Sequence, residues 1–157
     1  METTIALAGG EDAALVAGLT KSLLEEIMAA TGTRHFAFDA GAVAGHFRDF
    51  LRRGGYAAYL ARQGEETVGL VTLSETRALY AGGTFGIVTE LYVRPDLRSG
   101  RIGERLLESA REHGKRAGWV RLEVTTPPLP EFERSLYFYQ THGFEIAGGR
   151  KLKALLS

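Results

Sequence analysis

The order in which strand-like and helix-like segments follow one another is the feature that most limits how this chain can fold. Three strand-like segments, at residues 56–62, 66–79 and 84–93, are separated only by short turns. A helical pattern at 103–117 then comes before a further strand-like segment at 120–125. Strands joined by short turns pair antiparallel, whereas a strand–helix–strand connection gives a parallel pair. The order therefore predicts an α+β protein with a mixed, mostly antiparallel sheet, and it excludes a doubly wound dinucleotide-binding fold.

The segments on either side extend the expected sheet to about six to seven strands with helices on both faces. In chain order they are a strand at 5–8, a helix that begins near residue 11, a helix at 39–53, a short helix at 134–141, and a closing hairpin of strands 144–147 and 151–155. The hairpin would turn at Gly148-Gly149, because glycine reaches positive φ without a Cβ clash. No linker is long enough to separate two domains, so residues 1–157 are expected to form a single domain.

The segment at 84–93 alternates between two faces along its length. Side chains in a strand point to opposite faces with a period of two. This pattern predicts that Thr89, Leu91 and Val93 share one face of the sheet, whereas Glu90 and Tyr92 lie on the other.

Charge and composition exclude several classes of function. Nineteen basic and nineteen acidic residues give zero net charge, which argues against nucleic-acid or membrane binding through bulk charge, although a local basic patch stays open. The chain has no cysteine, which excludes disulfides, a thiolate nucleophile and thiolate zinc sites. The four histidines show no metal-ligand spacing, so we expect no metal. Without a signal peptide or a long apolar run, we expect a cytoplasmic protein with no membrane or nucleic-acid partner.

The loop at 98–103 lies between the third strand-like segment and the helix that follows it. Backbone N–H groups at a helix N-terminus lack intrahelical acceptors, and Gly100 and Gly103 would let that backbone approach a phosphate closely. Arg98 and Arg101 could add charged donors. A diphosphate ligand is one interpretation, and an ordinary glycine-containing turn is the other. The sequence has neither a P-loop nor a Rossmann fingerprint.

Residues 90–107 resemble the acetyl-CoA-binding motif of the GNAT N-acetyltransferase superfamily. Its pattern, Arg/Gln-x-x-Gly-x-Gly/Ala, corresponds here to Arg98, Ser99, Gly100, Arg101, Ile102 and Gly103. Arg101 is a departure, because the family usually has glycine at that position. A left-handed backbone at Arg101 would cost roughly 1–2 kcal/mol.

A second segment supports the resemblance. Residues 135–144 are similar to the family's A-x-x-F-Y-x-x-x-G-F pattern, with Phe138-Tyr139 and Gly143-Phe144 in register. The two motifs occur in the family's order with a strand-like segment between them. The order of elements also follows the family, so the resemblance covers nearly the whole chain and implies a GNAT-like fold.

The resemblance implies acetyl-CoA as the acyl donor and an amine as the acceptor, with direct attack and no covalent enzyme intermediate. The strand that holds Leu91, Tyr92 and Val93 would splay from its neighbour, and the backbone of these residues would bind the pantetheine arm. The pyrophosphate would be wrapped by Ser99, Gly100, Arg101, Ile102, Gly103 and Glu104. Homodimers are common in the family, so a homodimer is open for this chain.

Direct attack makes two demands on proton transfer. An alkylammonium group must lose its proton before it attacks, and the departing thiolate gains from a nearby acid. The resemblance places Tyr139 at the acid position; the alternative is a core aromatic. Glu90 is the leading base, alone or through a water, against the alternative of a solvated strand carboxylate. Glu123 on the neighbouring strand is the second candidate base.

Other interpretations stay open beside an N-acetyltransferase. One is a non-catalytic acyl-CoA-binding or sensing module of the same fold, and another is an acyltransferase that uses a longer acyl donor. The acceptor, a small molecule or a peptide, is not identified by the sequence. Phe36 and Phe38 are candidates for the acceptor pocket or for simple packing, and a tight closing hairpin would leave the acceptor groove open on its side.

Overall fold

The computed structural model describes residues 2–33 and 38–157, so Phe36 lies outside the described residues. The chain divides into two compact units, Met1–Thr125 and Thr126–Ser157. Each unit is described separately below. In the described ranges, no helix combines the length and the apolar character needed to cross a membrane.

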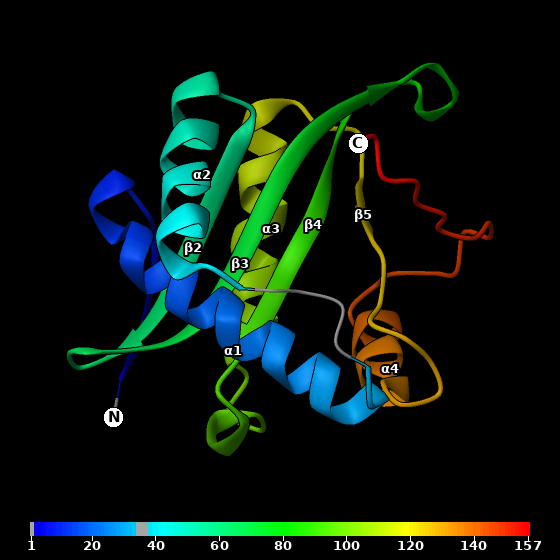
Figure 1. Ribbon diagram of the computed structural model, residues 1–157. Helices are drawn as coiled ribbons and strands as arrows, with labels where there is room; N and C mark the ends of the chain where they lie inside the picture. Colours follow the sequence, from blue (N-terminus) through cyan, green and yellow to red (C-terminus); the bar gives the residue numbers. More distant parts are fainter. Residues whose placement is uncertain (1, 34–37) are drawn as a thin grey trace. The chain divides into compact units, whose positions relative to one another are not determined.

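The first unit is built around one mixed sheet (Figure 1). Its strands, in spatial order as well as chain order, are β1 (Thr3–Leu7), β2 (Tyr56–Gln63), β3 (Glu66–Ala78), β4 (Gly83–Val93) and β5 (Leu122–Val124). The first four pair antiparallel, and β4 and β5 pair parallel. The α+β sheet predicted from the order of segments is therefore confirmed, with five strands in place of the expected six to seven.

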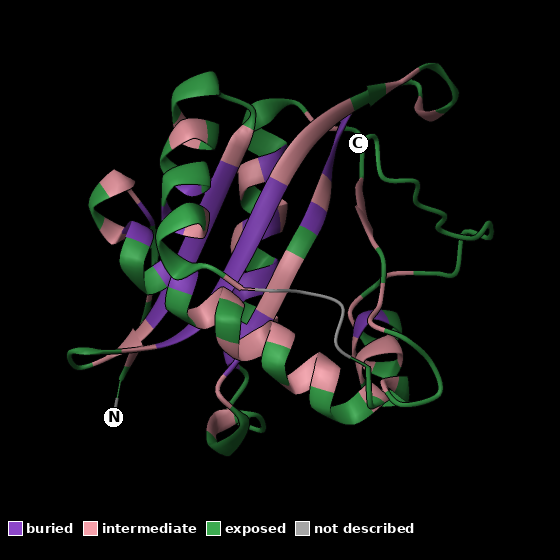
Figure 2. Cartoon of the chain, in the orientation of Figure 1, coloured by how far each residue is buried: buried purple, intermediate pink, exposed green. Residues whose placement is uncertain are grey.

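Helices cover both faces of this sheet. They are α1 (Ala13–Thr31), α2 (Ala40–Arg53) and α3 (Ile102–Ala117). Helices α1 and α2 lie on one face and α3 on the other (Figure 1). Each face has its own apolar core, and the buried residues concentrate along β2, β3 and β4 (Figure 2). The middle of the sheet is therefore largely apolar on both faces.

A register shift interrupts the alternation of β4. On β3, Thr72 pairs with Glu90 and the next residue, Leu73, pairs with Val88, so Thr89 is an extra residue in β4. Such a β-bulge switches which residues face each side of a sheet. Val88 and Val93 pack in the same core on the α3 face, although their odd spacing would place them on opposite faces of a regular strand. The expectation that Thr89 and Glu90 lie on opposite faces is therefore wrong.

Strands β4 and β5 part soon after they meet. Their pairing covers only Gly86–Val88 on β4 and Leu122–Val124 on β5. Residues 89–93 of β4 continue to pair with β3 on the other side. Among the described residues, this end of β4 has no strand partner on the β5 side. The resemblance of the sequence motifs to the family implies such a separation of the two strands.

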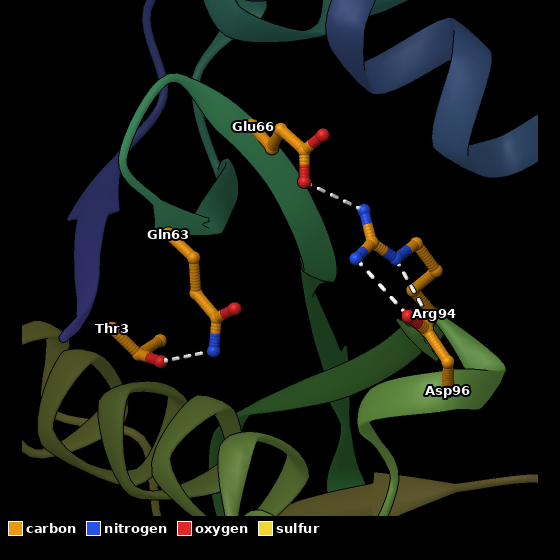
Figure 3. A network of polar contacts seen from close by, with 5 residues as sticks. All are labelled: Thr3, Gln63, Glu66, Arg94 and Asp96. Carbon is orange, nitrogen blue, oxygen red and sulfur yellow. Dashed lines mark hydrogen bonds and ion pairs between the residues drawn. The ribbon is translucent and has the colours of Figure 1, made fainter. Parts of the chain in front are cut away.

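A polar network fixes the turn that follows β4 (Figure 3). The Arg94 guanidinium donates to the carboxylates of Glu66 and Asp96 at 2.8–3.2 Å. The Arg94 backbone N–H donates to the carbonyl of Val68 at 2.9 Å. Beside it, Gln63 donates to Thr3 and ties β2 to β1 at 3.0 Å. The chain therefore leaves β4 in a fixed direction and enters the loop before α3.

The second unit contains one helix, α4 (Glu133–Thr141), among its described residues. No strand follows it, so the predicted closing hairpin is wrong. Gly148 and Gly149 do have positive φ, at 89° and 78°. However, Ile146 and Leu152 are 70% and 90% exposed. Two strands without an apolar face to bury are at best marginal, which accounts for the absence of a hairpin.

Candidate active site

A pocket of about 720 Å³ opens in the first unit where the end of α2 meets the sheet. Phe50 and Gly54 line it from α2 and its C-cap, Tyr56 from β2, Ser74 from β3 and Glu90 from β4. The pocket therefore combines an aromatic wall, a hydroxyl group and one of the carboxylates singled out in the sequence.

Glu90 is held by two threonine hydroxyls. Thr72 Oγ1 donates to Glu90 Oε1 in a short hydrogen bond, and Thr89 Oγ1 donates to the same oxygen at 3.2 Å. The Glu90 backbone N–H donates to Thr72 Oγ1 at 2.9 Å. Because the bulge brings Thr89 and Glu90 to one face, both reach Thr72 on the neighbouring strand. The carboxylate is thus fixed in the pocket wall.

Tyr56 stands beside this carboxylate. Burial, together with the negative charge of Glu90, raises the pKa of Tyr56 to about 12, although hydrogen bonds with Thr72 and Thr89 act in the opposite direction. Its ring packs edge-on against Phe50 at a centroid distance of 5.1 Å. At neutral pH the pocket therefore presents a neutral phenol next to Glu90.

The loop before α3 contains the strain expected at Arg101. Its φ is 67°, which makes it the one non-glycine residue with positive φ in residues 2–33 and 38–157. It forms the N-cap of α3, and Ile102 is buried directly after it. In the described part of the chain, the backbone N–H groups of Arg101, Ile102 and Gly103 have no backbone acceptor. The loop therefore keeps the donors that an anion would need, despite the missing glycine.

Arg98 is already engaged by the protein. Its guanidinium donates twice to Glu26 on α1, at 2.8 and 2.6 Å, and once to the carbonyl of Val93, at 2.7 Å. The hydrogen bonds to Glu26 raise the pKa of Arg98. The guanidinium also lies over the ring of Tyr92, 5.5 Å from its centroid. In this arrangement Arg98 braces the end of β4 against α1.

The other sequence candidates for cofactor binding lie at the end of β4 and the start of α3. Tyr92 and Val93 are buried, and Leu91 packs against the α3 core. Ser99 and Gly100 are exposed in the turn. Glu104, in the first turn of α3, lies 4.0 Å from the Arg101 guanidinium. The structure thus brings one end of β4 and the N-terminus of α3 to the same end of the first unit.

Glu123 occupies a different setting from Glu90. It lies on β5 opposite Ile87 and forms a short ion pair with Arg121. It is not among the residues that line the pocket. Of the two candidate bases, Glu90 is the one that lines this pocket.

Tyr139, the candidate acid, lies in α4 of the second unit. It is buried and contacts Phe138 and Phe144 edge-on, each at a centroid distance of 5.5 Å. Burial raises the pKa of Tyr139 to about 12. The phenol is therefore fully protonated at neutral pH.

Two residues that surround Glu90 are not identified from the sequence. Thr72 lies in an otherwise apolar strand, where its lone hydroxyl within Val68–Leu73 is a usable signal. Tyr56 lies at the start of a strand, and no sequence signal separates it from an ordinary strand tyrosine. No group of three or more histidine, aspartate or glutamate residues that could hold a metal ion occurs in the described ranges.

A family model described as an acetyltransferase (GNAT) domain matches residues 54–146 of this chain. That range holds the pocket strands, the loop before α3 and α4. A search of curated proteins gave no match.

Solved structures share the fold over nearly the whole chain. An integron cassette protein from the Cole Harbour Salt Marsh metagenome has a TM-score of 0.80 at 24% identity, over 98% of this chain and 90% of that one. A ribosomal-protein-alanine N-acetyltransferase from Brucella melitensis has a TM-score of 0.75 at 21% identity, over 98% of this chain and 100% of that one. The aminoglycoside N-acetyltransferase AAC(6')-Iy, in complex with CoA, has a TM-score of 0.80 at 15% identity, over 99% of this chain and 96% of that one.

Proposed function

Because this chain belongs to the GNAT acetyltransferase family, we propose that it is an N-acetyltransferase that moves the acetyl group of acetyl-CoA to a primary amine by direct attack. The observation that carries this proposal is the Glu90 pocket, which lies beside the stretch of β4 that has parted from β5. In the same proposal, residues 1–157 act as a single acetyltransferase domain.

Acetyl-CoA would bind along the parted stretch of β4 and the start of α3. Extended backbone at Leu91–Val93 offers hydrogen-bonding groups to the amides of the pantetheine arm. The N–H groups of Arg101, Ile102 and Gly103, which have no backbone acceptor among the described residues, suit the pyrophosphate, since a helix N-terminus favours anions. The Arg98 brace supports this site indirectly, because it fixes the end of β4.

Glu90 would remove the proton from the acceptor ammonium group, directly or through a water. The amine nitrogen then attacks the thioester carbonyl, a C–N bond forms, and the C–S bond to CoA breaks. The nitrogen releases a second proton as it becomes an amide, and this proton balances the one that Tyr139 gives to the sulfur. Glu123 is the weaker candidate, because Arg121 already pairs with it and it does not line the pocket.

Tyr139 would assist the departing CoA thiolate. A phenol with a pKa of about 12 stays protonated across the neutral range. It can therefore donate a hydrogen bond to the sulfur as negative charge develops there and supply the proton that completes the free thiol. This assignment follows from the family motif around Phe138-Tyr139.

Calorimetric titration with acetyl-CoA, with CoA and ATP as comparisons, tests the cofactor site first. Micromolar binding that weakens in a Gly103→Leu variant is the expected result. An acceptor screen then follows, and it includes aminoglycosides and peptides with an N-terminal alanine, because similar structures carry those names. No binding at millimolar acetyl-CoA would contradict the proposal.

Two variants separate an enzyme from a non-catalytic acyl-CoA-binding module. We expect Glu90→Gln and Tyr139→Phe to bind acetyl-CoA normally and to lose turnover by about 10²–10⁴-fold, the usual range for general acid–base groups. Glu123→Gln is the matched control and should remain close to the wild type. If the wild type binds acetyl-CoA but acetylates no amine, the binding module is the better description.

A further inference from the structure

We propose that Thr72 and Thr89 are positioning residues that hold one oxygen of Glu90, so that the other oxygen is available to the proton of the acceptor amine. This inference rests on the proposed function, in which Glu90 is the base. It assigns a role to two residues that no motif identifies.

Thr72 is an unusual residue for its position. It is 0% exposed, as are its neighbours Val71 and Leu73, and apart from tyrosines it is the one buried polar or charged residue among those that the structure describes. A buried hydroxyl is costly unless it is hydrogen-bonded. Its hydrogen-bond partners are Thr89, Glu90, including the Glu90 backbone N–H, and Tyr56 in the pocket wall. The buried threonine therefore serves the polar group around Glu90 and not the sheet in general.

The bulge in β4 makes this arrangement possible. In a regular strand Thr89 and Glu90 would point to opposite faces. The extra residue brings both side chains to Thr72, with the two threonine hydroxyls 2.7 Å apart. A shift of one residue in the pairing of β4 would separate Thr72, Thr89 and Glu90. Their hydrogen bonds therefore depend on the bulge.

The hydrogen bonds have a defined direction. Thr72 Oγ1 accepts from the Glu90 backbone N–H, and its single hydroxyl hydrogen points to Glu90 Oε1. Thr89 can then donate to Thr72 Oγ1 or to Oε1, because both lie within reach. Both hydroxyls that reach the carboxylate therefore reach the same oxygen, Oε1. No hydrogen bond to Glu90 Oε2 is found in residues 2–33 and 38–157.

An asymmetric clamp of this kind suits a base. Fixing Oε1 removes the rotational freedom of the carboxylate, and productive proton transfer depends on that geometry. Among the described residues no hydrogen bond to Oε2 is found, and Glu90 lines the pocket. The alternative is that Thr72 only satisfies the Glu90 backbone N–H at the bulge, in which case its hydroxyl would matter to folding and not to turnover.

Steady-state kinetics on Thr72→Val, Thr72→Ser and Thr89→Val separate these alternatives. Valine keeps the branched shape without the hydroxyl, and serine keeps the hydroxyl. We expect Thr72→Val to lower kcat on the order of 10–100-fold, below the loss in Glu90→Gln, with the Kd for acetyl-CoA unchanged. Thr72→Ser should recover most of the activity, and Thr89→Val should show a smaller loss.

The Glu90→Gln background supplies the decisive control. Thr72→Val should have no further effect on kcat there, because the group it positions has been removed. Wild-type kcat in Thr72→Val, or an equal loss with and without Glu90, would overturn the clamp while leaving the proposed function intact. If Thr72→Val does not fold, the pair Thr89→Val and Thr72→Ser carries the test.

A measurement without turnover keeps this result distinct from a failure of the proposed function. NMR of protein labelled with ¹³C at the glutamate side-chain carboxyl follows Glu90 directly. Its resonance should move in Thr72→Val and stay in place in Thr72→Ser. An unmoved resonance would overturn the clamp even if the wild type acetylated no amine.

Discussion

At the scale of single residues, the site depends on charged side chains that are held by partners on other elements of the fold. Glu90 is oriented by Thr72 on β3 and by its own neighbour Thr89. Arg98 braces the end of β4 through Glu26 on α1. In both cases a charged side chain that looks like a ligand contact in the sequence also has a partner within the protein.

Arg101 provides a direct test of backbone strain. Its left-handed conformation costs roughly 1–2 kcal/mol, and glycine would relieve that cost but lose about 0.5–1 kcal/mol through extra freedom in the unfolded chain. We therefore expect Arg101→Gly to raise the free energy of unfolding by up to about 1.5 kcal/mol, measured by urea denaturation. Arg101→Ala, which removes the charge but keeps the Cβ, should show no such gain. A loss of stability in the glycine variant would contradict this account.

His113 should make stability depend on pH. Burial and then the charge of Arg116 lower its pKa below the ordinary value, with a partly opposing effect from Glu75. Its Nδ1 lies 2.9 Å from the Tyr59 hydroxyl. Because the folded state takes up the proton less readily, the unfolded state is favoured as pH falls below about 6.5.

Urea unfolding between pH 8 and pH 5 measures this effect. The wild type should lose stability on the acid side more steeply than His113→Asn, which keeps an acceptor near Tyr59 but does not titrate. If the free energy of unfolding falls with pH equally in both proteins, His113 is not the cause of the acid destabilisation.

At the scale of elements, Trp119 links α3 to the sheet by filling a slot between two glycines. A Cβ on Gly86 of β4 would lie 2.1 Å from the indole ring, and one on Gly114 of α3 would lie 2.9 Å from it. The indole N–H donates to Glu75 on β3 at 2.7 Å. The three elements are therefore joined around one aromatic side chain, close to the end of the sheet where β4 and β5 pair.

Gly86→Ala should destabilise the protein by about 1–3 kcal/mol, the usual cost of overpacking a filled core. Gly18→Ala on the exposed side of α1 is the matched control, because a Cβ there meets nothing within 4 Å. That control should gain about 0.5–1 kcal/mol, since alanine is the better helix former. Thermal unfolding should show a lower Tm for Gly86→Ala and a higher Tm for Gly18→Ala. Equal changes in Tm would contradict the tight packing of Trp119 against Gly86.

Strand and helix periodicity predicted most elements but not their local irregularities. The strands at 56–62, 66–79 and 84–93 were recognisable because each alternates or is continuously apolar. The bulge at Thr89 was not, because a register shift depends on the partner strand and leaves no mark in one strand's own pattern. The hairpin at Gly148-Gly149 was wrong because turn glycines do not create a face to bury.

At the scale of the whole molecule, the second unit has regular secondary structure in α4 and none in the residues that follow it. Residues 145–157 are exposed and contain no helix or strand. Exposed irregular segments are the preferred sites of proteolysis. We expect trypsin to cut first after Arg150, Lys151 or Lys153, with mass spectrometry as the readout. Earlier cleavage within the sheet of the first unit would contradict this order.

The separation of β4 from β5 affects how strongly function would constrain the amino-acid sequence of β4. If the donor's amides are bound by main-chain groups along β4, no individual side chain there is needed to recognise them. Leu91 and Val93 are then free to serve the core. Selection would act on the path of the backbone, and residue identity could change widely. Such a division of labour would allow one fold to be kept at low identity, as in the structures that share this fold at TM-scores of 0.75–0.80 and 15–24% identity.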